Sequence, residues 1–323
     1  MGCLRDTRTN EHGLHLDGCM VCLMVNGSIM KFLICSDGSE QADRAIRLGA
    51  AIAAGCEAEV TLFGIAESEG SSKTILDSLQ RGQSLLEDKK IHAELITKSG
   101  DPIEEIVRRT EEALYDLVVI GAVRKAERGS FWMSSKAYKI IKEIKPPVLS
   151  VAGKSTTITR VLICSGGKRY IERAVALAGQ MARAMKATVT LLHVMPEPPA
   201  IYAHLPRIDE TASWLLNSRS ELGLTLRHGK EMLESLGVTA EVHLRRGSVL
   251  GEILREIDEG GYDLVVTGSA LSRSLRTYVL GDISREIVNR ATCAVLVARG
   301  TETPDDFRFS LRGLFGRGAR KAA

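Results

Sequence analysis

Glycines and small hydroxyl residues follow several short apolar runs of this chain, in an order that suits an anion-binding turn. Asp37, Gly38 and Ser39 come directly after the run FLICS. Gly268 and Ser269 directly follow the run LVVT. Glycine lets a backbone approach a phosphate closely, and the free amides at the start of a helix attract negative charge. These residue types therefore point to the binding of a phosphorylated ligand.

Two longer glycine-containing stretches follow related runs. They read Gly121-Ala-Val-Arg124, nine residues, then Ser134-Ser135, and Gly268-Ser-Ala-Leu271, nine residues, then Gly281-Asp-Ile-Ser284. The runs before them belong to an internal repeat, because YDLVVIG at Tyr115–Gly121 recurs as YDLVVTG at Tyr262–Gly268. Upstream matches recur at a shorter spacing, so the second copy carries an insertion near Pro196–Leu224. We expect this insertion to overhang the sheet as a lid or a contact surface.

The elements that must position these turns alternate regularly. Short β-branched runs are followed by longer segments of helical period, which is the pattern of parallel βα units. In the first copy the predicted strands are 31–36, 59–65, 92–97, 116–121 and 147–151, and the predicted helices are 39–54, 71–89, 102–113 and 134–144. We therefore expect an α/β protein with two tandem, doubly wound, parallel five-stranded sheets. Such sheets bind ligands beyond the carboxyl ends of their strands.

The motifs, in this order and present twice, resemble the universal stress protein family over nearly all of residues 30–300. The residues that carry the resemblance are ICSDGSEQADRAI after the first strand, the DLVV-x-G strand, and the closing PVL or AVLV strand. The resemblance implies Rossmann-like sheets of the adenine nucleotide alpha hydrolase type in two domains, 30–153 and 157–300. It also implies that the domains pair through their last strands as a pseudo-twofold within the chain, and it is compatible with a further homodimer.

ATP is the ligand that the resemblance implies, because ATP-binding members wrap its phosphates in the pattern Gly-x2-Gly-x9-Gly-Ser/Thr. The matching positions of this chain are Asp37, Gly38, Ser39, Gly121, Gly268, Ser269, Gly281 and Ser284. The first copy has Arg124 and Ser134 where the family has its later glycines. Cations could still hold an anion there by charge, namely Arg124, Lys125, Arg128 and Lys136.

The second copy departs from the family pattern in a complementary way. Leu271 replaces the middle glycine, and Gly166 stands where the first copy has Asp37. Asp282 replaces the hydroxyl residue, and we interpret it as the N-cap of a helix over 283–291. Neither copy therefore keeps the complete nucleotide loop.

Three functions stay open at this point. The first is a cytoplasmic, universal stress protein-like binding or regulatory protein with degenerate ATP or nucleotide binding. The second is a nucleotide-dependent ATPase or switch that uses the glycine loop of the second copy. The third is a structural partner of a transporter or regulator. An enzyme is not expected and no catalytic residue is assigned, because no Ser-His-Asp or Cys-His arrangement follows from spacing; His193, at a strand end, is interpreted as structural.

Composition limits the partners and the compartment. The 323 residues are 44% hydrophobic with a net charge of +3, which is typical of a soluble protein and too small a charge to favour nucleic acid. Cys35 and Cys164 lie inside apolar runs, which favours reduced thiols and a cytoplasmic location. No run is long enough for a membrane span, and no signal peptide is recognised.

The two ends lie outside the repeats. Residues 1–29 are expected to be a disordered N-terminal extension, although His12, His15, Cys19 and Cys22 are residue types that bind zinc. Their spacing matches no site that we can assign, so no metal is predicted. Residues 301–323 form a basic C-terminal tail.

Overall fold

The computed structural model describes most of the chain between its two ends. The described residues are 29–68, 70, 72–122, 124–127, 130–133, 135–153, 156–166, 172–197, 211–271 and 278–299. The N-terminal extension with His12, His15, Cys19 and Cys22, for which no metal is predicted, and the basic tail lie outside the described residues.

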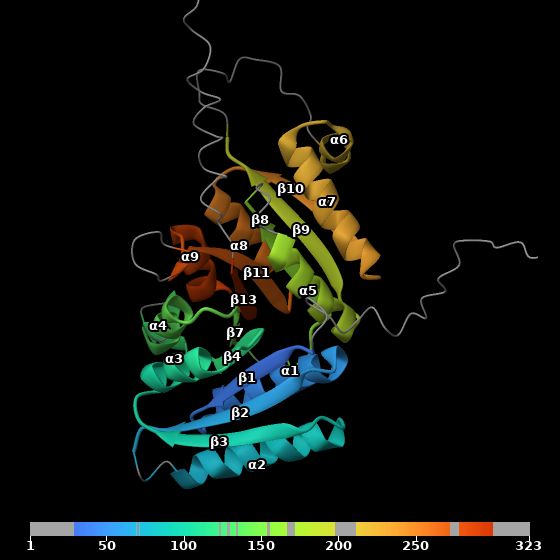
Figure 1. Ribbon diagram of the computed structural model, residues 1–323. Coiled ribbons are helices and arrows are strands. Elements are labelled where there is room, and N and C mark those ends of the chain that lie inside the picture. Colours follow the sequence, from blue (N-terminus) through green and yellow to red (C-terminus); the bar gives the residue numbers. More distant parts are fainter. Residues whose placement is uncertain are drawn as a thin grey trace, which may run out of the picture.

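Two similar halves follow one another in the chain (Figure 1). The first consists of β1 (Lys31–Ser36), α1 (Glu40–Cys56), β2 (Glu59–Ala66), α2 (Ser72–Asp88), β3 (Ala93–Ser99), α3 (Pro102–Glu112), β4 (Leu117–Gly121), β5 (Arg124–Glu127), β6 (Ser130–Met133), α4 (Ser135–Glu143) and β7 (Val148–Val151). The second consists of β8 (Arg160–Ser165), α5 (Glu172–Met185), β9 (Thr188–Met195), α6 (Ala212–Asn217), α7 (Glu221–Ser235), β10 (Ala240–Arg246), α8 (Val249–Gly260), β11 (Leu264–Leu271), β12 (Tyr278–Val279), α9 (Asp282–Arg290) and β13 (Ala294–Arg299). The predicted α/β alternation is confirmed, whereas the hairpin of β5 and β6 was not predicted.

One sheet runs through both halves in the order β10-β9-β8-β11-β13-β7-β4-β1-β2-β3. The five main strands of each half are parallel, but β13 and β7 pair antiparallel, with Leu296 opposite Leu149. The predicted pairing through the last strands is therefore confirmed. Because the main strands of the two halves run in opposite directions, their carboxyl ends point to opposite sides of the sheet. Each half therefore has a carboxyl edge, where its main strands end, and an amino edge, where they begin.

The core consists of two layers, and each layer crosses from one half to the other. Helices α1, α2, α5 and α7 cover one face of the sheet, and α3, α4, α8 and α9 cover the other. Phe32 and Ile34 of β1 point into the first layer, while Leu33 and Cys35 point into the second. A central parallel strand buried on both faces reads as a continuous apolar run for this reason.

The described cysteines, at positions 35, 56, 164 and 293, form no disulfide bond. Burial raises the pKa of Cys35 and raises the pKa of Cys164 to about 12. Both thiols are therefore protonated and unreactive at neutral pH. None of the helices within the described ranges has the length and apolar character of a membrane span.

The aspartate of the repeated Tyr-Asp pair fixes the start of the first strand in each half. Asp116 accepts a hydrogen bond from the amide of Lys31, 2.8 Å away. Asp263 accepts from the amide of Thr159 at 2.8 Å, from its hydroxyl at 2.6 Å, and from the amide of Arg160 at 3.2 Å. The carboxylate thus satisfies edge amides that the sheet leaves free.

These unequal bonds predict unequal effects on stability. We expect Asp263→Ala to lower the free energy of unfolding by about 2 kcal/mol and Asp116→Ala by about 1 kcal/mol. The loss is larger for Asp263 because its carboxylate accepts more charge-assisted hydrogen bonds than that of Asp116. Urea unfolding followed by far-UV circular dichroism would measure both. Equal losses in the two variants would contradict the assigned role of Asp263.

Candidate functional site

The turn after β1 uses its polar side chains within the first half. The Asp37 carboxylate accepts from the amide of Ser39 at 2.9 Å, and the Ser39 hydroxyl accepts from the amide of Ala42 at 3.2 Å. The amide of Gly38 donates to the Ser36 hydroxyl at 3.1 Å, and Gly38 has a φ of +78°, which favours glycine. Asp37, Gly38 and Ser39 therefore build the turn and cap α1.

Helix α2 is bound closely to the carboxyl edge of the first half. The Ser78 hydroxyl donates to Asp43 at 2.5 Å and lies 3.0 Å from the Ser36 hydroxyl, while Arg81 pairs with the same Asp43 at 2.8 Å. A Cβ added to Gly64 at the end of β2 would lie 2.5 Å from a side-chain carbon of Ile75. The helix thus covers the ends of β1 and β2.

Gly121 at the end of β4 is required by packing. A Cβ at this position would lie 2.7 Å from the carbonyl carbon of Gln41 and 2.8 Å from the amide nitrogen of Ala42. The strand therefore touches the first turn of α1. Of the cations predicted to hold an anion, Lys136 forms an ion pair with Glu67. The side chains of the other three lie outside the described residues.

The matching glycines of the second half have no such contact among the described residues. A Cβ added to Gly268 or to Gly281 would meet no described atom within 4 Å, while residues 167–171 and 272–277 lie outside the described ranges. The Ser284 hydroxyl donates to the carbonyl of Gly268 at 2.8 Å and lies 2.8 Å from the hydroxyl of Thr267. Gly268, Gly281 and Ser284 are therefore brought together at the end of β11 and the start of α9.

The prediction that Asp282 caps this helix is wrong. Gly281 holds the N-cap position with φ −57° and ψ 157°, and as a glycine it makes no side-chain cap bond to the first turn. Asp282 is already helical, so its exposed carboxylate only complements the positive end of the helix dipole. Amides without a side-chain cap at a helix start can bind an anion.

Ser269, also predicted as a ligand contact, belongs to a different set of bonds. Its side chain is buried, donates to the carbonyl of Ala298 at 3.2 Å and accepts from Arg299 at 2.9 Å. The guanidinium of Arg299 is itself buried and reaches the end of α4 in the first half. The sequence analysis did not single out Arg299, because its partners in the first half are distant in the chain.

His193 occupies the end of β9 where the first half has Gly64. Its Nδ1 lies 3.0 Å from the carbonyl oxygen of Ser165, which can only accept, so Nδ1 carries the proton. Burial lowers the pKa of His193, so the ring is neutral at pH 7.

A hollow of about 440 Å³ lies between α5 and α7, lined by Glu172, Val175, Arg219, Glu221, Leu224, Thr225, His228 and Gly229.

The predicted lid lies partly beyond the described ranges, since residues 198–210 are not described. The described part forms α6 and the start of α7. Arg227 donates from Nε to the carbonyl of Leu216 at 2.8 Å and from Nη2 to that of Ser218 at 2.9 Å. These bonds fix the end of α6 against α7, and the role of a lid stays a prediction.

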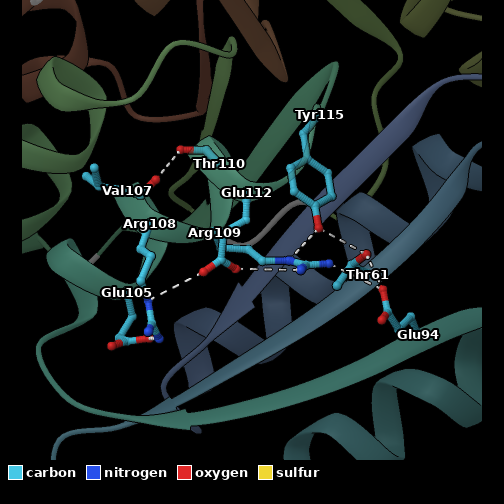
Figure 2. A network of polar contacts seen from close by, with 9 residues as sticks. All are labelled: Thr61, Glu94, Glu105, Val107, Arg108, Arg109, Thr110, Glu112 and Tyr115. Carbon is cyan, nitrogen blue, oxygen red and sulfur yellow. Dashed lines mark hydrogen bonds and ion pairs between the residues drawn. The ribbon is translucent and has the colours of Figure 1, made fainter.

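A polar network at the opposite, amino edge of the first half is structural (Figure 2). Figure 2 shows Arg109 of α3 between Tyr115, Thr61 and Glu94. Arg109 donates to the Tyr115 hydroxyl at 2.8 Å and lies 3.4 Å from Glu94, and the Tyr115 hydroxyl donates to Thr61 at 3.4 Å. The network joins α3 to β2 and β3, and its ion pair is exposed and therefore weak.

The second half carries a network at the equivalent place with a carboxylate at its centre. Glu256 accepts from the Tyr262 hydroxyl at 2.7 Å, from His243 at 2.9 Å and from Arg245. Burial acts to raise the pKa of Glu256, but these hydrogen bonds outweigh it and lower the pKa below its usual range. Neither network adjoins the open glycines, and the described residues contain no cluster of His, Cys, Asp and Glu suited to a metal ion.

Comparison with known proteins matches both halves of the chain to one family. The sequence profile of the universal stress protein family matches residues 28–152 and again 157–299. Universal stress protein YxiE of Bacillus subtilis is 28% identical over 145 residues, which is 43% of this chain and 98% of that protein.

Two solved structures resemble the whole tandem chain. A universal stress protein from Archaeoglobus fulgidus has a TM-score of 0.62 and 19% identity, covering 83% of this chain and 98% of its own. A protein from Pseudomonas aeruginosa described as a putative universal stress protein has a TM-score of 0.62 and 15% identity, covering 88% and 96%. At this identity the likeness establishes the fold.

The different surroundings of the two matching glycines give a direct test. We expect Gly121→Ala to lower the free energy of unfolding by about 2 kcal/mol, because the new methyl group would overlap the backbone of α1. The matched variant Gly268→Ala should change it by less than about 0.5 kcal/mol, because the new methyl group would meet no described atom within 4 Å. Urea unfolding would measure both, and a tolerated alanine at position 121 would show that α1 does not close the first edge.

Proposed function

Because this chain belongs to the universal stress protein family through both of its halves, we propose that it is a stress-response protein that acts by binding an adenine nucleotide at the carboxyl edge of its second half. The observation that carries the proposal is the backbone at Gly268 and Gly281, where an added Cβ would meet no described atom within 4 Å, next to the start of α9, whose N-cap glycine makes no side-chain cap bond. Phosphate can approach such a backbone closely and accept from its amides.

The first half supports the proposal by contrast. Its Gly121 is covered by α1, and α2 is held over the ends of β1 and β2 by the bonds of Ser78 and Arg81 to Asp43. A nucleotide would have to displace this packing. We therefore infer one nucleotide per chain, with the first half serving as scaffold.

Binding rather than hydrolysis is the activity proposed. The hydroxyls of Thr267 and Ser284 bond to each other, and Ser284 donates to the carbonyl of Gly268. These bonds join β11 to the first turn of α9, which is a structural role for both hydroxyls. A nucleotide-dependent switch is the second candidate function, and the observation that favours it is the bond between Ser269 and Arg299, which joins this loop to the other half.

The compartment that we propose is the cytoplasm. The described cysteines form no disulfide bond, and burial raises the pKa of the Cys35 and Cys164 thiols. Unpaired, buried thiols are typical of proteins kept under reducing conditions.

Calorimetric titration with Mg·ATP tests the nucleotide site, after mass spectrometry of the native protein has identified any ligand carried through purification. We expect saturable binding of one nucleotide per chain and its loss in Gly281→Val, because the side chain would fill the space at the start of α9. Gly251→Val is the matched control, since Gly251 lies exposed on α8 and an added Cβ meets only Ser248. Folded protein with neither heat nor carried ligand would refute the proposal.

The exposed carboxylate of Asp282 gives a second prediction. It lies in the first turn of α9, where it opposes the approach of a phosphate. We expect Asp282→Asn to tighten nucleotide binding about fivefold and to weaken its dependence on Mg²⁺, because a repulsion at close range is removed. Titrations with and without Mg²⁺ would measure this, and weaker binding by the variant would place the phosphates elsewhere.

A further inference from the structure

Arg299, the last residue of β13, connects the two halves through a buried guanidinium. It donates from Nε to the carbonyl of Pro146 at 3.0 Å and from Nη2 to those of Ile141 at 2.6 Å and Ile144 at 3.0 Å. It donates from Nη1 to the hydroxyl of Ser269 at 2.9 Å. The first three acceptors belong to the first half, and the fourth belongs to the second.

The first-half acceptors lie at the end of α4 and just beyond it. The last carbonyls of a helix have no partner within the helix, and they form the negative end of its dipole. A guanidinium presents several donors in a fixed plane, so it can satisfy these carbonyls together. Arg299 is only 7% exposed, so water does not compete freely for these bonds. The end of α4 is therefore held by a residue of the second half.

The second-half acceptor lies next to the proposed nucleotide loop. Ser269 directly follows Gly268 and is paired with Arg299 in the register of β11 and β13. Beyond it, β12 returns antiparallel to β11 and contacts α4. The loop that would bind the nucleotide and the helix of the other half thus share one buried side chain and one contact surface.

The connection is present on one side of the pseudo-twofold. The residues of the first half that correspond to Ser269 and Arg299 are Ala122 and Ala152, and both are buried. Alanine has no donor or acceptor with which to join its own loop to α9. The polar link therefore runs from the second-half loop to the first-half helix.

From this geometry we propose that Arg299 is a positioning residue that couples the glycine loop of the second half to helix α4 of the first half, so that a ligand bound at the loop also stabilises α4. The proposal deepens the proposed function and rests on it. Coupling requires an element that both sites bias, and here that element is the shared set of bonds around the guanidinium. Through this coupling, nucleotide binding changes the stability of α4 and of the surface around it.

Amide hydrogen exchange measured by mass spectrometry on the full chain tests the coupling. Without nucleotide, we expect peptides covering residues 135–147 to exchange about tenfold faster in Arg299→Met than in the wild type, because the end of α4 loses its partners. Arg255→Met, which removes an exposed arginine of α8, is the control and should change nothing in these peptides. Unchanged exchange in Arg299→Met would overturn the proposal.

The same experiment with saturating Mg·ATP separates coupling from mere support of the fold. In the wild type the nucleotide should slow exchange in the loop and in residues 135–147. In Ser269→Ala, which keeps the bonds of Arg299 to α4, exchange without nucleotide should match the wild type, and protection by nucleotide should stay within the second half. If the nucleotide protects α4 as strongly in Ser269→Ala as in the wild type, the coupling is overturned. Ser269→Ala provides this test even if Arg299→Met does not fold.

The two proposals fail in different ways. If calorimetry finds no nucleotide binding, the proposed function is refuted and nucleotide coupling falls with it, while the exchange of the unliganded protein still decides whether Arg299 holds α4. If nucleotide binds and protects only the second half of the wild type, the proposed function stands and the coupling is refuted.

Discussion

The antiparallel pairing of β7 with β13 is the interaction on which the rest of the structure depends. A last strand without a partner would expose a row of amides and carbonyls at a sheet edge. The pairing of β7 with β13 gives both last strands a hydrogen-bonded neighbour and joins the two halves into one sheet. The helices then pack across the junction: a Cβ on Gly55 of α1 would lie 2.6 Å from the carbonyl oxygen of Ala184 of α5. Two core layers shared by both halves follow from this one register.

The same pairing decides where the loops of each half lie. Because the halves run in opposite directions, the carboxyl end of one last strand lies beside the start of the other. The loop after the fourth main strand of each half is therefore carried onto the fourth helix of its neighbour: β6 contacts α9, and β12 contacts α4. A duplicated domain built this way is not a pair of independent units, since a change in one loop alters the packing of the other half. Sequence divergence between the copies can consequently divide the roles of scaffold and binding site.

The fold was predictable because its sequence signals lie within a few residues of one another. Much of the candidate site was not predictable, since its contacts join residues that are far apart in the chain. Apolar runs and glycine turns define strands and helices within a few residues, and the repeat supplies a second reading of each. Gly121 and Gly268 end the same DLVV-x-G motif, yet Gly121 contacts α1 and Gly268 has no described atom within 4 Å of an added Cβ. Ser269 matches a ligand position, but its hydroxyl belongs to Arg299. The helix capped by Gly281 was misjudged by one residue, which is the usual error at element ends.

The burial of Arg299 explains why the link exists on one side alone. Removing a guanidinium from water is costly, and it is tolerated only where several oxygens replace the lost hydration. The end of α4 supplies three carbonyls at the negative pole of a helix, and Ser269 supplies a fourth acceptor. Where the first half has Ala152 instead, this cost is absent and so is the connection. A symmetric pair of such links would bind both loops to the opposite helices, whereas Arg299 provides the link from the second-half loop to α4, and a coupling of this kind acts equally in both directions.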